Sequence, residues 1–246
     1  DLILLDWMLP LITGDEWTRR LKASEQYRDI PIIFGTVTDP IRGRIISKYK
    51  QPSGNVTGVS DAPPLEAQLA LFKEILPSLK TIGFLYNPGL VNSLSLLEWT
   101  EKAAQSMGIE VLAGPTPTTN EIIAVTKKLV GKVDALYIPT DTTILSAVEA
   151  IVKIGQDAGV PVFSGEPGSV KRGAVATLGL NYVEIGKMSG RIAGDVLNGQ
   201  QVGKIDAIIA RDVSHDHRIA INLKAAKIAK IKISPLLIER SKLVYH

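Results

Sequence analysis

The stretch TIGFLYNPGLVNSLSLLEWTEKAAQSMGIEVLAGP, Thr81–Pro115, decides the fold of this chain. Its first run, Thr81–Tyr86, has the length and composition of a buried strand, and Asn92–Met107 has helical periodicity. A second short apolar run, Glu110–Leu112, follows the helix. Strand, helix and strand in this order predict two parallel strands joined by a crossover helix.

The same alternation continues in both directions along the chain. The other strand-like runs are short and apolar: Leu2–Leu5, Ile30–Phe34, Val56–Val59, Ala135–Ile138, Val160–Phe163, Ala174–Leu178 and Ala207–Ala210. The other helix-like segments are Pro64–Leu76, Thr119–Val130, Thr142–Ala158 and Tyr182–Leu197. Continuous apolar strands that alternate with helices predict an α/β fold, with doubly wound parallel sheets covered on both faces.

Two proline-containing breaks, Asp61–Pro64 and Pro77–Lys80, predict two lobes. A complete series of strands begins after the second break, so residues 79–199 are predicted to form lobe two. Lobe one takes residues 1–78 and 200–246. Few strand-like runs precede Pro77, and the chain begins directly on one, so we expect lobe one to be truncated or rejoined.

Composition excludes several classes of protein. The chain has 246 residues, 45% of them hydrophobic and 22% charged, which is typical of a folded globular protein. Cysteine is absent, which excludes disulfides and thiolate chemistry. The net charge is +3, and the densest basic stretch, Lys224–Lys232, has no aromatic residue, which favours a solvated face over nucleic-acid binding. No apolar run is long enough to span a membrane, so we expect neither nucleic-acid binding nor membrane insertion.

Polar side chains follow most of the predicted strands, where open parallel sheets bind their ligands. In chain order these residues are Thr36, Thr38, Asp39, Asn87, Asn92, Ser93, Thr140, Asp141, Thr142, Ser164, Glu166, Ser169, Asn181 and Tyr182. Hydroxyl groups and helix-start N–H groups bind a carboxylate, and Asp or Glu binds an ammonium group. The set therefore suits a neutral or zwitterionic ligand. The alternative is that these residues are ordinary helix caps and turn residues.

Signals for catalysis are weak. All three histidines, His215, His217 and His246, lie near the end of the chain. The triplet His215-Asp216-His217 fits a surface turn better than a metal site, because no third ligand lies at a useful spacing. Phosphate-loop, dinucleotide and G-x-S-x-G motifs are missing. We therefore expect no catalytic residue, no metal, no cofactor and no enzyme activity.

From about Ile30 onward the chain resembles ABC-transporter substrate-binding proteins of the tryptophan/tyrosine-binding-like family. The matching motifs are IPIIFGTVTDP, PSGNVTGVSD, EILPSLKTIGFLYNPGLVNS, KVDALYIPTDTT and SVKRGAVATLGLNYVEIGKMSG. The resemblance implies a two-lobed type I periplasmic-binding fold outside the cytoplasm, a ligand held between the lobes and a membrane permease as partner. It implies ligand contacts from Thr38, Asp39, Asn87, Asn92, Ser93, Thr140, Asp141 and Glu166. The chain shows no signal peptide, which also fits a protein made in the cytoplasm.

Residues 1–36 instead resemble the middle of a response-regulator receiver domain, through DLILLDWMLP and RDIPIIFGT. This resemblance puts Asp6 at the phosphoacceptor position and Thr36 at the switch position. Receiver chemistry also needs an upstream acidic pair and a lysine after the fifth strand, and neither is found, so phosphorylation of Asp6 is not expected. In binding-protein relatives a small polar loop touches the ligand here. The bulky Trp7–Leu11 in its place predicts weak or absent binding.

Together the two resemblances favour a hybrid, in which a receiver-like piece joins a binding-protein scaffold near Ile30–Thr36 to give a flavodoxin-like first lobe. A natural truncated homologue is the alternative origin. The predicted function is that of a solute-binding scaffold of an ABC importer with a small amino-acid-like ligand. Two rival functions stay open: a signalling module of receiver or sensor type, and an engineered chimera without ligand function.

The run Leu2–Leu5 lacks the neighbouring strand that a doubly wound lobe places beside it. An exposed apolar strand edge invites another chain. We therefore predict a homodimer through this edge, with Trp7, Met8 and Leu9 in or near the contact. The alternative is that the C-terminal segment SPLLIERSKLVY, residues 234–245, covers the edge from within the same chain.

Overall fold

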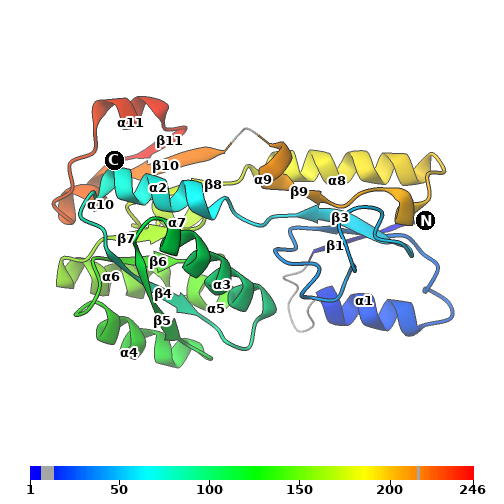
Figure 1. The fold of residues 1–246 in the computed structure, drawn as a ribbon, viewed down its shortest axis with the longest axis horizontal. Coiled ribbons are helices and arrows are strands. Elements are labelled where there is room, and N and C mark those ends of the chain that lie inside the picture. Colours follow the sequence, from blue (N-terminus) through cyan, green and yellow to red (C-terminus); the bar gives the residue numbers. More distant parts are fainter. Residues whose placement is uncertain (7–13, 215–216) are drawn as a thin grey trace. The chain divides into compact units, whose positions relative to one another are not determined.

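The structure, a computed structural model, describes residues 1–6, 14–214 and 217–246 (Figure 1). The chain divides into two compact units. Unit 1 comprises Asp1–Pro63 and Leu180–Asp216, and unit 2 comprises Pro64–Gly179 and His217–His246. Trp7–Leu11, His215 and Asp216 lie outside the described residues, so the predictions made for them, the ligand loop, the dimer contact and the His-Asp-His turn, stay predictions.

The main sheet of unit 2 is parallel, with the strand order β5-β4-β6-β7. Its strands are β4 (Thr81–Tyr86), β5 (Glu110–Pro115), β6 (Ala135–Ile138) and β7 (Val162–Ser164). Pairing runs from Thr81 opposite Glu110 to Tyr86 opposite Pro115. The predicted strand–helix–strand element is therefore confirmed, with helix α3 (Val91–Ser106) as the crossover.

Three further helices connect these strands: α4 (Thr119–Leu129), α5 (Thr142–Leu145) and α6 (Val148–Ala158). A capping box of Thr118 and Glu121 begins α4, as the sequence indicates, and Gly159 in the left-handed conformation ends α6. The single helix expected over 142–158 is wrong, because the chain leaves helical geometry at Ala147, with φ −121° and ψ 22°.

Unit 2 also contains a second sheet, with the order β11-β10-β8, that the sequence did not predict as such. Its strands are β8 (Ala176–Gly179), β10 (Arg218–Asn222) and β11 (Leu243–Tyr245), with helices α7 (Pro167–Lys171), α10 (Leu223–Ile228) and α11 (Pro235–Arg240). Strand β10 runs antiparallel to β8 and parallel to β11. The C-terminal segment 234–245 thus belongs to unit 2, and its expected role as a cover for the Leu2–Leu5 edge is wrong.

The sheet of unit 1 is parallel and has the order β1-β2-β3-β9. Its elements are β1 (Ile3–Asp6), α1 (Gly14–Ala23), β2 (Ile32–Gly35), β3 (Val56–Ser60), α8 (Tyr182–Leu197), the 3-10 turn η1 (Val202–Lys204), β9 (Ile208–Ile209) and α9 (Ala210–Val213). Within the described part of the chain, β1 is an edge strand, and the side chain of Leu4 is 62% exposed. The edge that the sequence predicts to be open is therefore present.

Side chains of β2 alternate between the two faces of this sheet, as expected for a strand covered on both sides. Ile32 and Phe34 pack in one cluster with Leu21 of α1, whereas Ile33 packs in another with Ile185 of α8. Helices α1 and α8 accordingly lie on opposite sides of the sheet (Figure 1).

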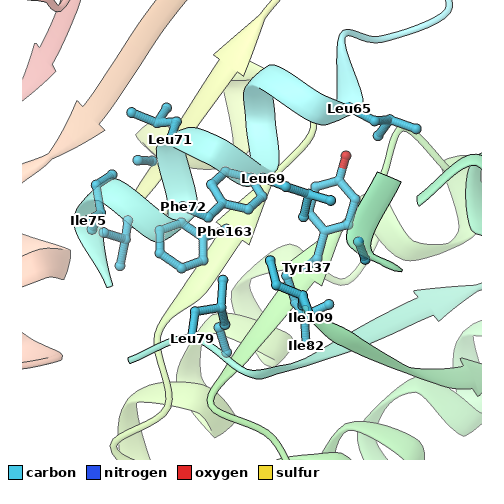
Figure 2. Packing of buried hydrophobic residues seen from close by; sticks show 14 of the residues in the cluster. Leu65, Leu69, Leu71, Phe72, Ile75, Leu79, Ile82, Ile109, Tyr137 and Phe163 are labelled. Atoms are coloured by element: carbon cyan, nitrogen blue, oxygen red, sulfur yellow. The ribbon is translucent and has the colours of Figure 1, made fainter. Parts of the chain in front are cut away.

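Helix α2 (Leu65–Ile75) lies on the core of unit 2 (Figure 2). The ring of Phe72 stacks on Phe163, with centroids 4.4 Å apart, and lies 5.6 Å from the ring of Tyr137. The fully buried amide of Gln68 donates to the carbonyl oxygens of Leu178 at 2.8 Å and Gly165 at 3.2 Å, and accepts from the Tyr137 hydroxyl at 2.7 Å. Helix α2 is thus fixed to unit 2 by both packing and hydrogen bonds.

The observed units therefore have different boundaries from the predicted lobes 1–78 with 200–246 and 79–199. Helix α2 and residues 217–246 belong to unit 2, and helix α8 belongs to unit 1. Which sheet a helix packs on depends on contacts such as Phe72 on Phe163, which sequence periodicity alone does not show. No helix within the described ranges is both long and apolar enough to cross a membrane.

Candidate functional site

Asp141 follows β6 and is fully buried in unit 2. Its Oδ1 accepts from the backbone N–H groups of Thr143 at 2.8 Å and Ile144 at 3.1 Å, which makes it the N-cap of α5. Its Oδ2 accepts from the backbone N–H of Asn87 at 2.7 Å and from the Ser93 hydroxyl at 2.5 Å. Four donors of the protein therefore surround this carboxylate, which joins the ends of β4 and β6.

The other predicted residues on α3 and after β4 surround Asp141. The Asn87 side chain donates to the Thr143 hydroxyl at 2.8 Å and accepts from the backbone of Gly89. The Asn92 side chain donates to the carbonyl oxygen of Thr140 at 3.2 Å. Asn92 and Ser93 lie in the first turn of α3, whose N-cap is Leu90, so neither residue caps this helix.

Glu166 follows β7 and caps the short helix α7. Its carboxylate accepts from the backbone N–H groups of Gly168 and Ser169 and from the Ser169 hydroxyl. Like Asp141, it is engaged by donors of its own unit. The structure thus brings Asn87, Asn92, Ser93, Thr140 and Asp141 together. The carboxylates of both acidic candidates in unit 2, Asp141 and Glu166, accept hydrogen bonds from the protein.

Unit 1 contributes a different arrangement at the carboxyl ends of its strands. The hydroxyl of Thr38, after β2, donates to Oδ1 of Asp61, after β3, at 3.0 Å. The hydroxyl of Tyr182, at the start of α8, lies 3.4 Å from Oδ2 of Asp61. The Ser60 hydroxyl donates to the Thr38 carbonyl oxygen at 2.9 Å, and Asp39 accepts from the backbone N–H of Arg42 at 2.9 Å. Thr38 and Tyr182 therefore meet on a carboxylate that was not among the predicted residues.

Asp61 has a strongly perturbed titration. Burial raises its pKa to about 6, the Thr38 and Tyr182 hydroxyl groups partly oppose the increase, and the charge of Asp6 adds to it. The sequence does contain a signal for this residue, because Asp61 is the second residue after the strand-like run Val56–Val59, in the motif GVSD. Examining the residues after that run, as for the other strands, would have found it.

The receiver-like positions also come together in unit 1. Asp6 ends β1 and Thr36 directly follows β2, and the Thr36 hydroxyl donates to Oδ1 of Asp6 at 2.5 Å. Thr36 has φ 56°, a left-handed conformation. This geometry places the two side chains side by side.

Comparison with known proteins decides the family. The family model described as ABC transporter substrate binding protein matches residues 18–244. The chain belongs to this family. The two-lobed type I fold, with a parallel sheet in each unit, agrees with this membership.

Two relatives show what similar proteins bind. The chain is 36% identical over 173 residues to a tyrosine-binding protein of Clostridioides difficile, a match that covers 70% of this chain and 50% of that protein. The ABC domain from Streptococcus pneumonia, solved in complex with L-Trp, is 30% identical with a TM-score of 0.80, covering 88% of this chain and 72% of that one. The chain spans about half the length of the curated tyrosine-binding relative.

A third match is short. A stretch of 36 residues is 64% identical to the phosphate regulon transcriptional regulatory protein PhoB of Pseudomonas aeruginosa, covering 15% of this chain and 16% of that protein. Its length is that of the receiver-like resemblance at the start of the chain. It covers too little of either protein to transfer a regulator's function to this one.

Proposed function

We propose that this protein is a solute-binding component of an ABC importer whose ligand is an amino acid, with aromatic amino acids the first candidates. The observation that carries the proposal is the set of polar groups at the carboxyl ends of the parallel strands, in a chain of this family. The names of the tyrosine-binding and L-Trp-bound relatives support the choice of ligand class.

Geometry divides the candidate ligand residues into two groups. The Thr140 hydroxyl makes no hydrogen bond to any residue the structure describes, and Asn92 uses only its amide N–H₂ group. These two are proposed to contact the ligand directly. Asn87, Thr38 and Asp39 stay candidates by their position after strands, with the protein hydrogen bonds of Asn87, Thr38 and Asp39 giving way or orienting the group. Asp141, Ser93 and Glu166 are proposed to shape the site, because their polar atoms are engaged by the protein. This assignment replaces the direct ligand contacts that the family resemblance implies for Asp141, Ser93 and Glu166.

Other parts of the proposal follow from family membership. The partner is a membrane permease, the working location is outside the cytoplasm, and the protein has no enzyme activity of its own. Units 1 and 2 act as the two lobes of the binding protein. A receiver function for Asp6 is not proposed.

A thermal-shift screen of the purified chain against the twenty standard amino acids tests the proposal. Ligand that binds only the folded protein raises the midpoint of unfolding, and the rise grows with the logarithm of the ligand concentration above Kd. We expect a rise with tyrosine, tryptophan or phenylalanine. No rise with any amino acid up to millimolar concentration would favour the rival interpretation, a hybrid scaffold without ligand function.

A second copy of the chain is the proposed partner at the β1 edge. Strand β1 pairs with β2 on one side only among the described residues, and its exposed Leu4 makes the edge apolar. An unpaired strand edge of this kind favours pairing with another strand.

A further inference from the structure

The carboxylate of Asp61 differs from every other buried acidic group described above in lacking adequate compensation for its charge. The residue is 9% exposed, and the side chains that donate to its carboxylate are the neutral hydroxyl groups of Thr38 and Tyr182, beside a backbone N–H group of Asp61 itself. The charged group that acts on it is another acid, Asp6 of β1. No cationic side chain of the described residues forms an ion pair with it. Buried charges in proteins are normally paired.

The comparison with Asp141 sharpens the contrast. Asp141 is 0% exposed, but three backbone N–H groups and one hydroxyl donate to its carboxylate, and two of the N–H groups belong to a helix start. Asp61 has fewer donors, and one of them is remote. A separation of 3.4 Å is long for an O–H···O hydrogen bond, so Oδ2 of Asp61 is the less satisfied oxygen.

The position of Asp61 fits a role toward a ligand. It directly follows β3, at the end of the sheet where parallel α/β folds bind small molecules. Tyr182, next to Oδ2, is 43% exposed, so the less satisfied oxygen lies beside a side chain that reaches solvent.

We propose that the Asp61 carboxylate binds the ammonium group of the ligand, with Thr38 and Tyr182 holding the carboxylate in position. This inference rests on the proposed amino-acid-binding function and names the contact that recognises the amino end of the ligand. A charge-assisted hydrogen bond between ammonium and carboxylate supplies the missing cation. The pKa of about 6 in the free protein agrees, because an unpaired buried carboxylate takes up a proton more readily than an exposed one.

The test uses isothermal titration calorimetry on the full chain with matched ligands. L-tyrosine and L-tryptophan are compared with 3-(4-hydroxyphenyl)propionate and indole-3-propionate, which lack only the ammonium group. The wild type should bind the amino acids at least about tenfold more tightly than the analogues. Asp61→Asn should lose this preference by weakening only the amino acids. Asp206→Asn is the matched control, because this exposed carboxylate of unit 1 accepts from the Gln51 backbone before β9, away from the strand ends that carry Asp61.

Affinity as a function of pH gives a second readout that needs no variant. Protonation of Asp61 should weaken amino-acid binding by the wild type about tenfold between pH 7.5 and pH 5, and leave the analogues unaffected. Equal amino-acid binding by wild type and Asp61→Asn, or a wild type that does not discriminate against the analogues, would overturn the inference and leave the proposed function intact. If the wild type binds no amino acid, the proposed function itself fails, and the inference fails with it.

Discussion

Replacing Asp61 by Asn should stabilise the ligand-free protein at neutral pH. Asn keeps the size of the side chain and an oxygen for the Thr38 hydroxyl, but it removes a charge that is 9% exposed. In the unfolded chain this carboxyl has the ordinary pKa of 3.8, and burial raises it to about 6 in the folded protein. At about 1.4 kcal/mol per tenfold change in proton affinity, the ionised group costs the folded state about 3 kcal/mol.

The sign of the pH dependence follows from the same values. Well below pH 3.8 the carboxyl is protonated in both states and the cost is absent, and at pH 4 the cost is still only about 0.5 kcal/mol. As the pH rises from 4 to above 6, the folded protein gives up a proton that the unfolded chain has already lost, so the free energy of unfolding falls. Wild type and Asp61→Asn should therefore have similar stability at pH 4, and the variant should be more stable by about 3 kcal/mol at pH 8.

Urea unfolding at several pH values measures the difference. Trp99 belongs to unit 2 and Trp17 to unit 1, so a background with Trp7→Phe and Trp99→Phe makes Trp17 fluorescence a reporter of unit 1. Asp206→Asn serves again as the control and should show no pH-dependent gain. A difference between wild type and Asp61→Asn that stays constant from pH 4 to pH 8, or a variant that is less stable at pH 8, would refute this account of Asp61.

Three further predictions concern other parts of the structure. Asp141→Ala should destabilise unit 2 by about 3–5 kcal/mol, because it leaves the backbone N–H groups of Asn87, Thr143 and Ile144 without their acceptor. Urea unfolding followed by Trp99 fluorescence measures the change, and a loss below about 1 kcal/mol would contradict the structural role of Asp141. Gly58→Ala should destabilise unit 1 by more than about 4 kcal/mol, because the added Cβ would lie 2.1 Å from the carbonyl oxygen of Phe34. Gly186→Ala in α8 is the control: its Cβ meets nothing within 4 Å, so the same urea unfolding should show no loss of stability or a gain. Sedimentation velocity at micromolar concentration should show a dimer that Leu4→Lys dissociates, because a lysine on an exposed strand edge opposes pairing; a wild type that sediments as a monomer of 26.5 kDa would reject the self-association.

The sequence predicted those elements whose local pattern is strong. Strands β4 and β6 have the predicted bounds, because each is a continuous apolar run between turn residues, and helix α8 begins and ends where its periodicity indicates. Strand β10, with the sequence RIAIN, was not predicted, because its apolar run is only three residues between Arg218 and Asn222 and its partner β8 lies far away in sequence. Its existence depends on a tertiary contact.

The sequence predicted only part of the candidate site, again because some of its features depend on tertiary contacts. The rule that ligands bind at strand carboxyl ends found Thr38, Asn87 and Asp141, and the structure places each of them at such an end. The rule does not show which carboxylates are already satisfied by the protein. Three backbone N–H groups from other residues and one hydroxyl donate to Asp141, whereas Asp61 has two hydroxyl groups and its own backbone N–H. This distinction depends on backbone N–H directions that only the folded chain defines.

Isothermal titration calorimetry of the full chain with L-tyrosine and with L-tryptophan at pH 7.5 tests the central claim, amino-acid binding, most directly. The account predicts saturable binding of at least one of the two, with one ligand per chain. Titrations that release no binding heat at several temperatures, together with an unchanged unfolding midpoint in millimolar amounts of either amino acid, would contradict it.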